Sequence, residues 1–176
     1  EIVPGWLSEF LFFVKFNCGC VPFLHPANFD NFPAMKIYPP LVRGVAEALH
    51  AIFEEGHYAD KVIHRLFKAN RKWGKRDRAF IAENVYEIVR WKRMLEYVIQ
   101  PDAKPEHLLG ANLILKGMRL PVWEEFKGRD PDSINKNRQK LAASGERKIV
   151  QSIPDWLDEL GQAELGEQWD AELTAL

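Results

Sequence analysis

The chain has 176 residues, enough for one domain with extensions, and its 47% hydrophobic and 28% charged residues are typical of a globular protein with a sizeable core. A formal net charge of −1 argues against a protein that coats nucleic acid with its whole surface. The charge is uneven, because residues 61–93 carry eleven Lys and Arg against three acids, whereas residues 153–176 carry seven acids and no Lys or Arg. This asymmetry indicates a local basic site.

Residues 1–34 form an apolar leader that differs from the rest of the chain, since they contain seven of the eleven Phe residues. Glu1 and Glu9 disfavour a signal peptide. The apolar run 10–16 is also shorter than the roughly 20 residues of a membrane span. We interpret the leader as upstream sequence before a natural start at Met35, with an apolar arm that packs on the domain as the alternative.

Two groups of residues are potential metal ligands. Cys18 and Cys20 form an incomplete ligand pattern with His25, and no fourth ligand is evident. Two cysteines this close cannot staple a core, and they indicate a reducing, cytoplasmic compartment. The second group is three histidines spaced seven residues apart, His50, His57 and His64. A glycine breaks the helix between the first two, so we interpret all three as surface residues and expect no metal site.

Three amphipathic helices are predicted in the first half of the domain. The first covers residues 41–55 and ends at Gly56, and the second covers residues 58–73. The third is the longest, from about Lys75 to Ile99. The residues expected to face the core are Leu41, Val45, Leu49 and Ile52, then Val62, Ile63, Leu66 and Phe67, then Phe80, Ile81, Val85, Ile88, Trp91, Leu95 and Val98.

Further helices are predicted in the second half. Residues 105–117 form a strongly apolar helix, and residues 121–126 a short turn. Residues 131–144 lie between a proline and a glycine and have few apolar positions, so we expect a surface helix there. Residues 153–176 form an acidic helical segment with a stripe at Leu165, Trp169 and Leu173. No run alternates with a period of two, so the predicted fold class is all-α.

Basic side chains gather at both ends of the third predicted helix and in the turn before it. The candidate RNA-binding residues are Arg71, Lys72, Lys75, Arg76, Arg78, Arg90, Lys92 and Arg93. The planar guanidinium of Arg suits phosphate, and Trp73 offers a platform for unpaired bases, whereas Trp91 is expected in the core. A solvated charged face is the alternative. A helix–turn–helix that binds DNA is disfavoured, because the apolar residues 79–82 follow the turn where base-reading polar side chains would be needed.

No sequence pattern indicates a catalytic centre. The chain has no Gly-rich phosphate loop, paired-Cys ligand set or nucleophile elbow, so we predict no catalytic residue and no cofactor site in it. Glu83 and Glu87 share a helix face, and we expect them to pair with Arg90 or neighbouring bases at i+3 or i+4.

The stretch EGHYADKVIHRLFKANRKWGKRDRAFIAENVYEIVRWKR, residues 55–93, resembles the NusB-like N-terminal domain of the RsmB/Sun family of ribosomal RNA 5-cytosine methyltransferases. The matching elements are YADKVI, RDRAFIAE and VYEIVRWKR, and the later SIPDWLDEL is similar to the Pro-x-Trp-Leu segment of the family. The resemblance covers about residues 36–176. The region INKNRQKLAASGERKIVQSI departs from the family's Phe-Val-Asn-x-Val-Leu-Arg signature, so only the basic positions of the first half are carried over.

The resemblance implies a bundle of about six to seven helices over residues 35–150. An acidic helical linker over residues 151–176 would lead to a Rossmann-like methyltransferase domain outside this chain. That domain would bind S-adenosylmethionine, and this chain would help to position the RNA. The implied partners are ribosomal RNA, foremost of the small subunit, and the chain's own methyltransferase domain, without membrane or DNA. The alternative is a free-standing NusB-type antitermination or protein-interaction module.

Overall fold

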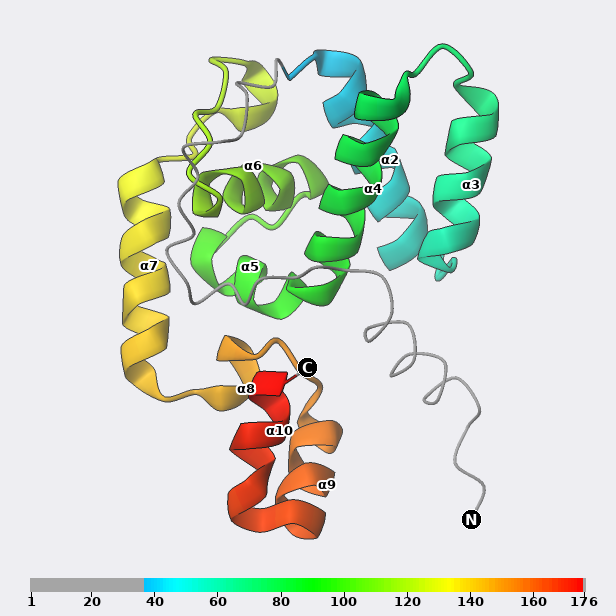
Figure 1. Cartoon of the computed structure of the whole chain (residues 1–176). Helices are drawn as coiled ribbons and strands as arrows, with labels where there is room; N and C mark the ends of the chain where they lie inside the picture. Colours follow the sequence, from blue (N-terminus) through cyan, green and yellow to red (C-terminus); the bar gives the residue numbers. More distant parts are fainter. Residues whose placement is uncertain (1–36, 176) are drawn as a thin grey trace. The chain divides into compact units, whose positions relative to one another are not determined.

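The computed structural model describes residues 37–175, and all regular structure in that range is helical (Figure 1). The absence of strands from these residues confirms the predicted all-α class. The described residues belong to two compact units, a larger one up to Pro154 and a smaller one from Asp155. The leader, with Cys18, Cys20 and His25, lies outside the described residues. No helix within 37–175 has both the length and the hydropathy of a membrane span.

The first two helices form much as their apolar periodicity predicts. In α2 (Pro39–Phe53) the predicted core positions Leu41, Val45 and Leu49 are buried, and the helix packs against α3, α4 and α6. The second helix, α3 (Ala59–Ala69), ends earlier than predicted. Asn70 follows it and donates a side-chain hydrogen bond of 3.0 Å to the carbonyl oxygen of Leu66. Asn commonly ends a helix in this way, because its side chain competes for backbone groups.

The prediction of one long third helix is wrong, because the chain divides it at Trp91. Helix α4 (Lys75–Arg90) and helix α5 (Lys92–Ile99) are separated by this residue, whose φ of −106° and ψ of 18° are not helical. The division lets α4 pack against α2, α3 and α6 while α5 packs against α6, α7 and α8. Trp91 is only partly buried, not in the core as predicted.

Helix α6 (Pro105–Leu115) is the centre of the larger unit. Most of its residues are buried, and it contacts α2, α4, α5 and α7 (Figure 1). A helix that is apolar on all sides is stable only inside a core. The absence of a side chain at Gly110 also lets Phe126 of the short helix η2 (Glu124–Phe126) approach, because a Cβ there would lie 3.2 Å from the Phe126 ring.

The larger unit is completed by α7 (Pro131–Ser144) and α8 (Arg147–Val150). Asp130 caps α7 by accepting from the Ser133 amide at 3.0 Å and the Ser133 hydroxyl at 2.7 Å. Only Ile134 and Leu141 of α7 are buried, as expected for a surface helix. Gly145 ends the helix with a φ of 70°, the left-handed conformation that glycine adopts without steric cost.

The smaller unit contains α9 (Asp155–Leu165), η3 (Gly166–Gln168) and α10 (Trp169–Ala175). Trp169 is its central side chain and donates from Nε1 to a carboxylate oxygen of Asp158 at 2.8 Å. A Cβ at Gly161 would overlap the Trp169 indole, so the glycine lets the ring lie against α9. Of the predicted stripe, Trp169 and Leu173 are buried, but Leu165 is 40% exposed.

Candidate nucleic-acid interface

The turn between α3 and α4 is built around Trp73. A Cβ at Gly44 of α2 would lie 2.8 Å from the Trp73 ring, so the indole rests directly on that helix. The ring also meets Phe67 of α3 edge-on, with centroids 6.4 Å apart. Trp73 is therefore a packing residue that ties the turn to α2 and α3. The ring is only partly buried, and these contacts leave less of it available to stack on an unpaired base than the sequence prediction assumed.

Arg78 and Asp77 hold the same turn in place. Arg78 donates from Nε to the carbonyl oxygen of Trp73 at 3.1 Å, and its guanidinium lies over the Phe67 ring, 5.6 Å from the centroid. The Asp77 carboxylate accepts from the Gly74 amide at 3.0 Å and thereby caps the start of α4. Arg78, a predicted RNA-binding residue, thus has an internal hydrogen-bond partner.

The basic residues at the other end of α4 are also engaged within the chain. Arg90 donates from Nη1 to the carbonyl oxygen of Gln151 at 2.8 Å, and Arg93 donates from Nη1 to that of Ile153 at 2.8 Å. The Arg93 amide donates to the Ser152 hydroxyl at 3.1 Å. Burial lowers the pKa of Arg90. These contacts fasten the segment 151–153, in which Ser152 has a φ of 51°, to the ends of α4 and α5.

Arg90 and Lys92 also contact aromatic rings. The Arg90 guanidinium lies over the Trp91 ring at 4.4 Å. Lys92 lies 4.4 Å from the centroid of Phe53 and forms an ion pair of 3.4 Å with Glu96 on the next turn of α5. All three basic residues at this end of α4 are therefore occupied by internal contacts.

Seven exposed basic residues remain on α3, on the following turn and on the first turn of α4. We call this set the basic ridge: Lys61, Arg65, Lys68, Arg71, Lys72, Lys75 and Arg76. Within residues 37–175, no member of the ridge forms an ion pair. Four members were candidate RNA-binding residues in the sequence. Lys61, Arg65 and Lys68 on α3 were not among those candidates, although their i, i+4, i+7 spacing places them along one side of a helix.

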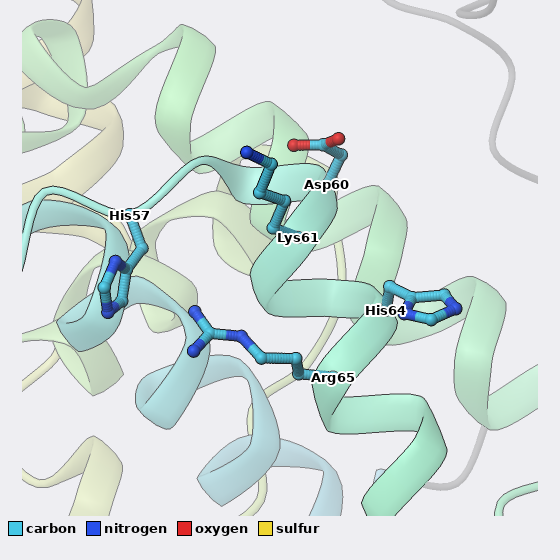
Figure 2. A pocket seen from close by; sticks show the side chains of 5 residues that line it. All are labelled: His57, Asp60, Lys61, His64 and Arg65. Carbon is cyan, nitrogen blue, oxygen red and sulfur yellow. The ribbon is translucent and has the colours of Figure 1, made fainter.

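An open pocket lies at the start of this ridge (Figure 2). It has a volume of about 730 Å³ and is lined by His57, Asp60, Lys61, His64 and Arg65. Figure 2 shows the Arg65 side chain extending toward His57, with Asp60 and Lys61 one turn earlier on α3. The pKa of Tyr86 on α4 is raised above its usual value. Burial of the phenol is the larger cause, and the negative charge of the nearby Asp60 is the second.

A polar network inside the larger unit corrects the expected pairing of Glu87. Instead of Arg90, the Glu87 carboxylate pairs with Lys116 and accepts from Asn112 Nδ2 at 3.0 Å. The same Asn112 nitrogen donates to Asn84 Oδ1 at 3.0 Å, and Asn84 Nδ2 donates to the carbonyl oxygen of Phe80 at 2.7 Å. Asn84 and Asn112 are both buried. The network joins α4 to α6. The sequence did not indicate it, because Asn84 and Asn112 stand among apolar residues with no pattern that predicts a polar contact.

The chemistry that the ridge offers is electrostatic. Exposed Lys and Arg side chains neutralise phosphates and release their counterions, which gives affinity without reading sequence.

Across residues 37–175 no cluster of His, Cys, Asp and Glu has the arrangement of a metal site. No family model matches the chain, and no curated protein or solved structure matches it either.

Proposed function

We propose that this chain is the NusB-like, RNA-binding helical domain of an S-adenosylmethionine-dependent ribosomal RNA (cytosine-C5) methyltransferase of the RsmB/Sun type. The observation that carries the RNA-binding part is the basic ridge, with seven exposed cations and no ion pair within the described residues. Such a surface is costly for the protein alone, because like charges repel, and it is favourable when a polyanion covers it. The choice of ribosomal RNA, of the small subunit foremost, comes from the resemblance of residues 55–93.

In this proposal the ridge binds the RNA backbone and the chemistry belongs to another domain of the same cytoplasmic enzyme. That domain would hold S-adenosylmethionine and transfer its methyl group to C5 of cytosine, while this chain contributes position and affinity. The ridge spans two helices and the turn between them, so it can follow several successive phosphates. Arg78 and Trp73 support the ridge by fixing the turn that presents Arg71 and Lys72.

The smaller unit supports a contact with protein. Trp156 and Leu160 of α9 are 43% and 50% exposed and lie four residues apart, on one side of the helix. In the proposed function their partner is the methyltransferase domain. In the alternative, a free-standing NusB-type module, the partner is a separate protein. The RNA-binding role of the ridge is common to both.

The test is binding of the full chain to a small-subunit ribosomal RNA fragment, measured by fluorescence anisotropy over a range of salt concentrations. Each phosphate contact on single-stranded RNA contributes roughly 0.7 to the slope of log affinity against log salt. Neutralising three ridge residues together, Lys68→Gln, Lys72→Gln and Arg76→Gln, should therefore lower the slope by about 2.

A second triple variant of equal charge change is the matched control. Arg119, Lys136 and Lys140 are exposed and lie outside the ridge, in the stretch before α7 and on α7 itself. Changing these three to Gln should leave the salt slope unchanged. Equal losses from both triples would mean that net charge alone drives binding, and a wild-type chain that binds no RNA at low salt would refute the proposed function.

A further inference from the structure

Tyr58 is a large aromatic residue that the core does not use. It precedes α3, and its side chain is 67% exposed. Helix α3 uses only the main chain of Tyr58. The Tyr58 carbonyl oxygen accepts from the Val62 amide at 3.0 Å, and the Tyr58 side chain makes no capping hydrogen bond. The ammonium of Lys61, the first residue of the basic ridge, lies 4.9 Å from the centroid of the ring. The ring is thus held beside a cation on the protein surface.

The pocket beside Tyr58 is lined by polar groups of both hydrogen-bonding kinds. Lys61 and Arg65 are donors, Asp60 is an acceptor, and His57 is a planar group that can do either. The His64 ring points to the other side of α3 from Arg65 and His57 (Figure 2), so it borders the pocket without facing them. A pocket that served a phosphate alone would be weakened by the Asp60 carboxylate. The edge of a base carries both donors and acceptors, so the mixed lining suits a base better.

The ridge runs from this pocket along α3 through Arg65 and Lys68. A strand whose phosphates lie on the ridge would bring the base of one nucleotide to the Tyr58 ring and the pocket next to it. An unpaired base can turn out of its strand and stack on an aromatic side chain, whereas the bases of an A-form duplex remain stacked inside the helix.

We propose that Tyr58 and the pocket lined by His57, Asp60, Lys61, His64 and Arg65 form a stacking site for one unpaired base, which makes single-stranded RNA the preferred ligand of the ridge. This inference rests on the proposed function and adds a base-binding site to its backbone contacts. The ridge supplies charge, and the stacking site supplies discrimination between an unpaired strand and a duplex.

The test compares two changes at Tyr58 in the full chain. Tyr58→Leu removes the ring, and Tyr58→Phe keeps it. The probes are an unstructured RNA strand and a blunt RNA duplex with the same number of phosphates, at one salt concentration. Tyr58→Leu should weaken binding of the single strand about tenfold and leave the duplex unchanged, and Tyr58→Phe should bind both like wild type. Because the side chain is exposed, circular dichroism and the thermal midpoint should be the same for all three proteins.

The outcomes separate this inference from the proposed function. Unchanged binding of the single strand by Tyr58→Leu, with the triple ridge variant still impaired, would refute the stacking site and leave the ridge as a backbone-binding surface. Equal losses on strand and duplex would also refute it. If an acidic peptide of equal charge binds as tightly as RNA, and Tyr58→Leu does not weaken its binding, the ridge is a protein-binding surface and the base-binding site is overturned.

Discussion

Arg90 is bound to the main chain of Gln151, 61 residues later, through a hydrogen bond of 2.8 Å from Nη1 to the carbonyl oxygen. Arg93 makes the equivalent bond to Ile153. These arginines look like part of a nucleic-acid surface when read along the sequence, because they stand in the basic run RWKR. In the folded chain they fasten the segment that leaves α8 to the junction of α4 and α5. Both arginines therefore have a structural role, and their RNA-binding role stays a prediction.

Replacing Arg90 should cost stability more than RNA binding. Arg90→Met keeps a long apolar stem over Trp91 but removes the donor to Gln151, and a hydrogen bond from a charged group contributes about 1.5–3 kcal/mol. We expect a loss of that size in the free energy of unfolding, measured by urea denaturation. Arg43→Met on the exposed side of α2 is the control and should change stability by less than about 0.5 kcal/mol. Equal effects would show that the bond to Gln151 contributes nothing.

Arg76 and Arg78 should separate binding from folding, although they lie two residues apart. Arg76 is exposed, so Arg76→Ala should lower the salt slope of RNA binding by about 0.7 without changing stability. Arg78 donates to Trp73 and lies over Phe67, so Arg78→Ala should cost about 1–2 kcal/mol of stability. Urea denaturation and anisotropy on both variants make the comparison. The reverse pattern would place Arg78 at the RNA and remove its role in the turn.

Asn112→Asp should make stability depend strongly on pH. The change replaces the donor to Asn84 and Glu87 by a buried carboxylate that faces two acceptors, and an unpaired buried charge costs about 3–5 kcal/mol. Burial and Glu87 would raise the pKa of the new carboxyl above its unfolded value, so the folded state binds the proton more tightly. The variant should therefore gain stability, relative to wild type, as the pH falls from 7 to 5.

The control for this change is Asn135→Asp, which places the same carboxylate on the exposed side of α7. Its thermal midpoint should follow that of wild type at both pH values. If Asn112→Asp also follows wild type, the network between α4 and α6 does not exclude a negative charge, and its role in holding the two helices together is wrong.

Asp130 should contribute stability that disappears in acid. Hydrogen bonds from Ser133 lower the pKa of Asp130 below its usual value of 3.8. The folded state therefore favours the ionised form, and the contribution is fully present above that value and is lost as the pH falls through the folded pKa. Asp130→Asn keeps an acceptor for the cap without the charge. The difference in unfolding free energy between wild type and this variant should shrink as the pH falls from 5 through the folded pKa of Asp130. Chemical denaturation at several pH values measures this difference. A difference that does not change with pH would contradict the prediction.

Much of the helical structure follows from the sequence because it depends on neighbours three and four residues apart. The positions of Leu41, Val45 and Leu49 on one side of α2, and the proline and glycine that bound α7, are local signals, and the structure follows both. The break at Trp91 had no such signal. Both helices contact α6, but α4 also packs against α2 and α3 whereas α5 packs against α7 and α8, and local periodicity does not register these contacts.

The sequence by itself determined that residues 37–175 are helical, which apolar positions of α2 and α3 enter the core, and that the positive charge is concentrated before and within α4. Only the tertiary structure decided which of those charges are available. Arg78, Arg90 and Arg93 donate to carbonyl oxygens, whereas Arg71, Lys72, Lys75 and Arg76 remain exposed with the basic residues of α3. The physical reason is that a backbone carbonyl partly withdrawn from water gains a donor only where the fold brings one to it. The donors that reach the part-buried carbonyls of Gln151 and Ile153 come from residues about sixty positions away in the chain.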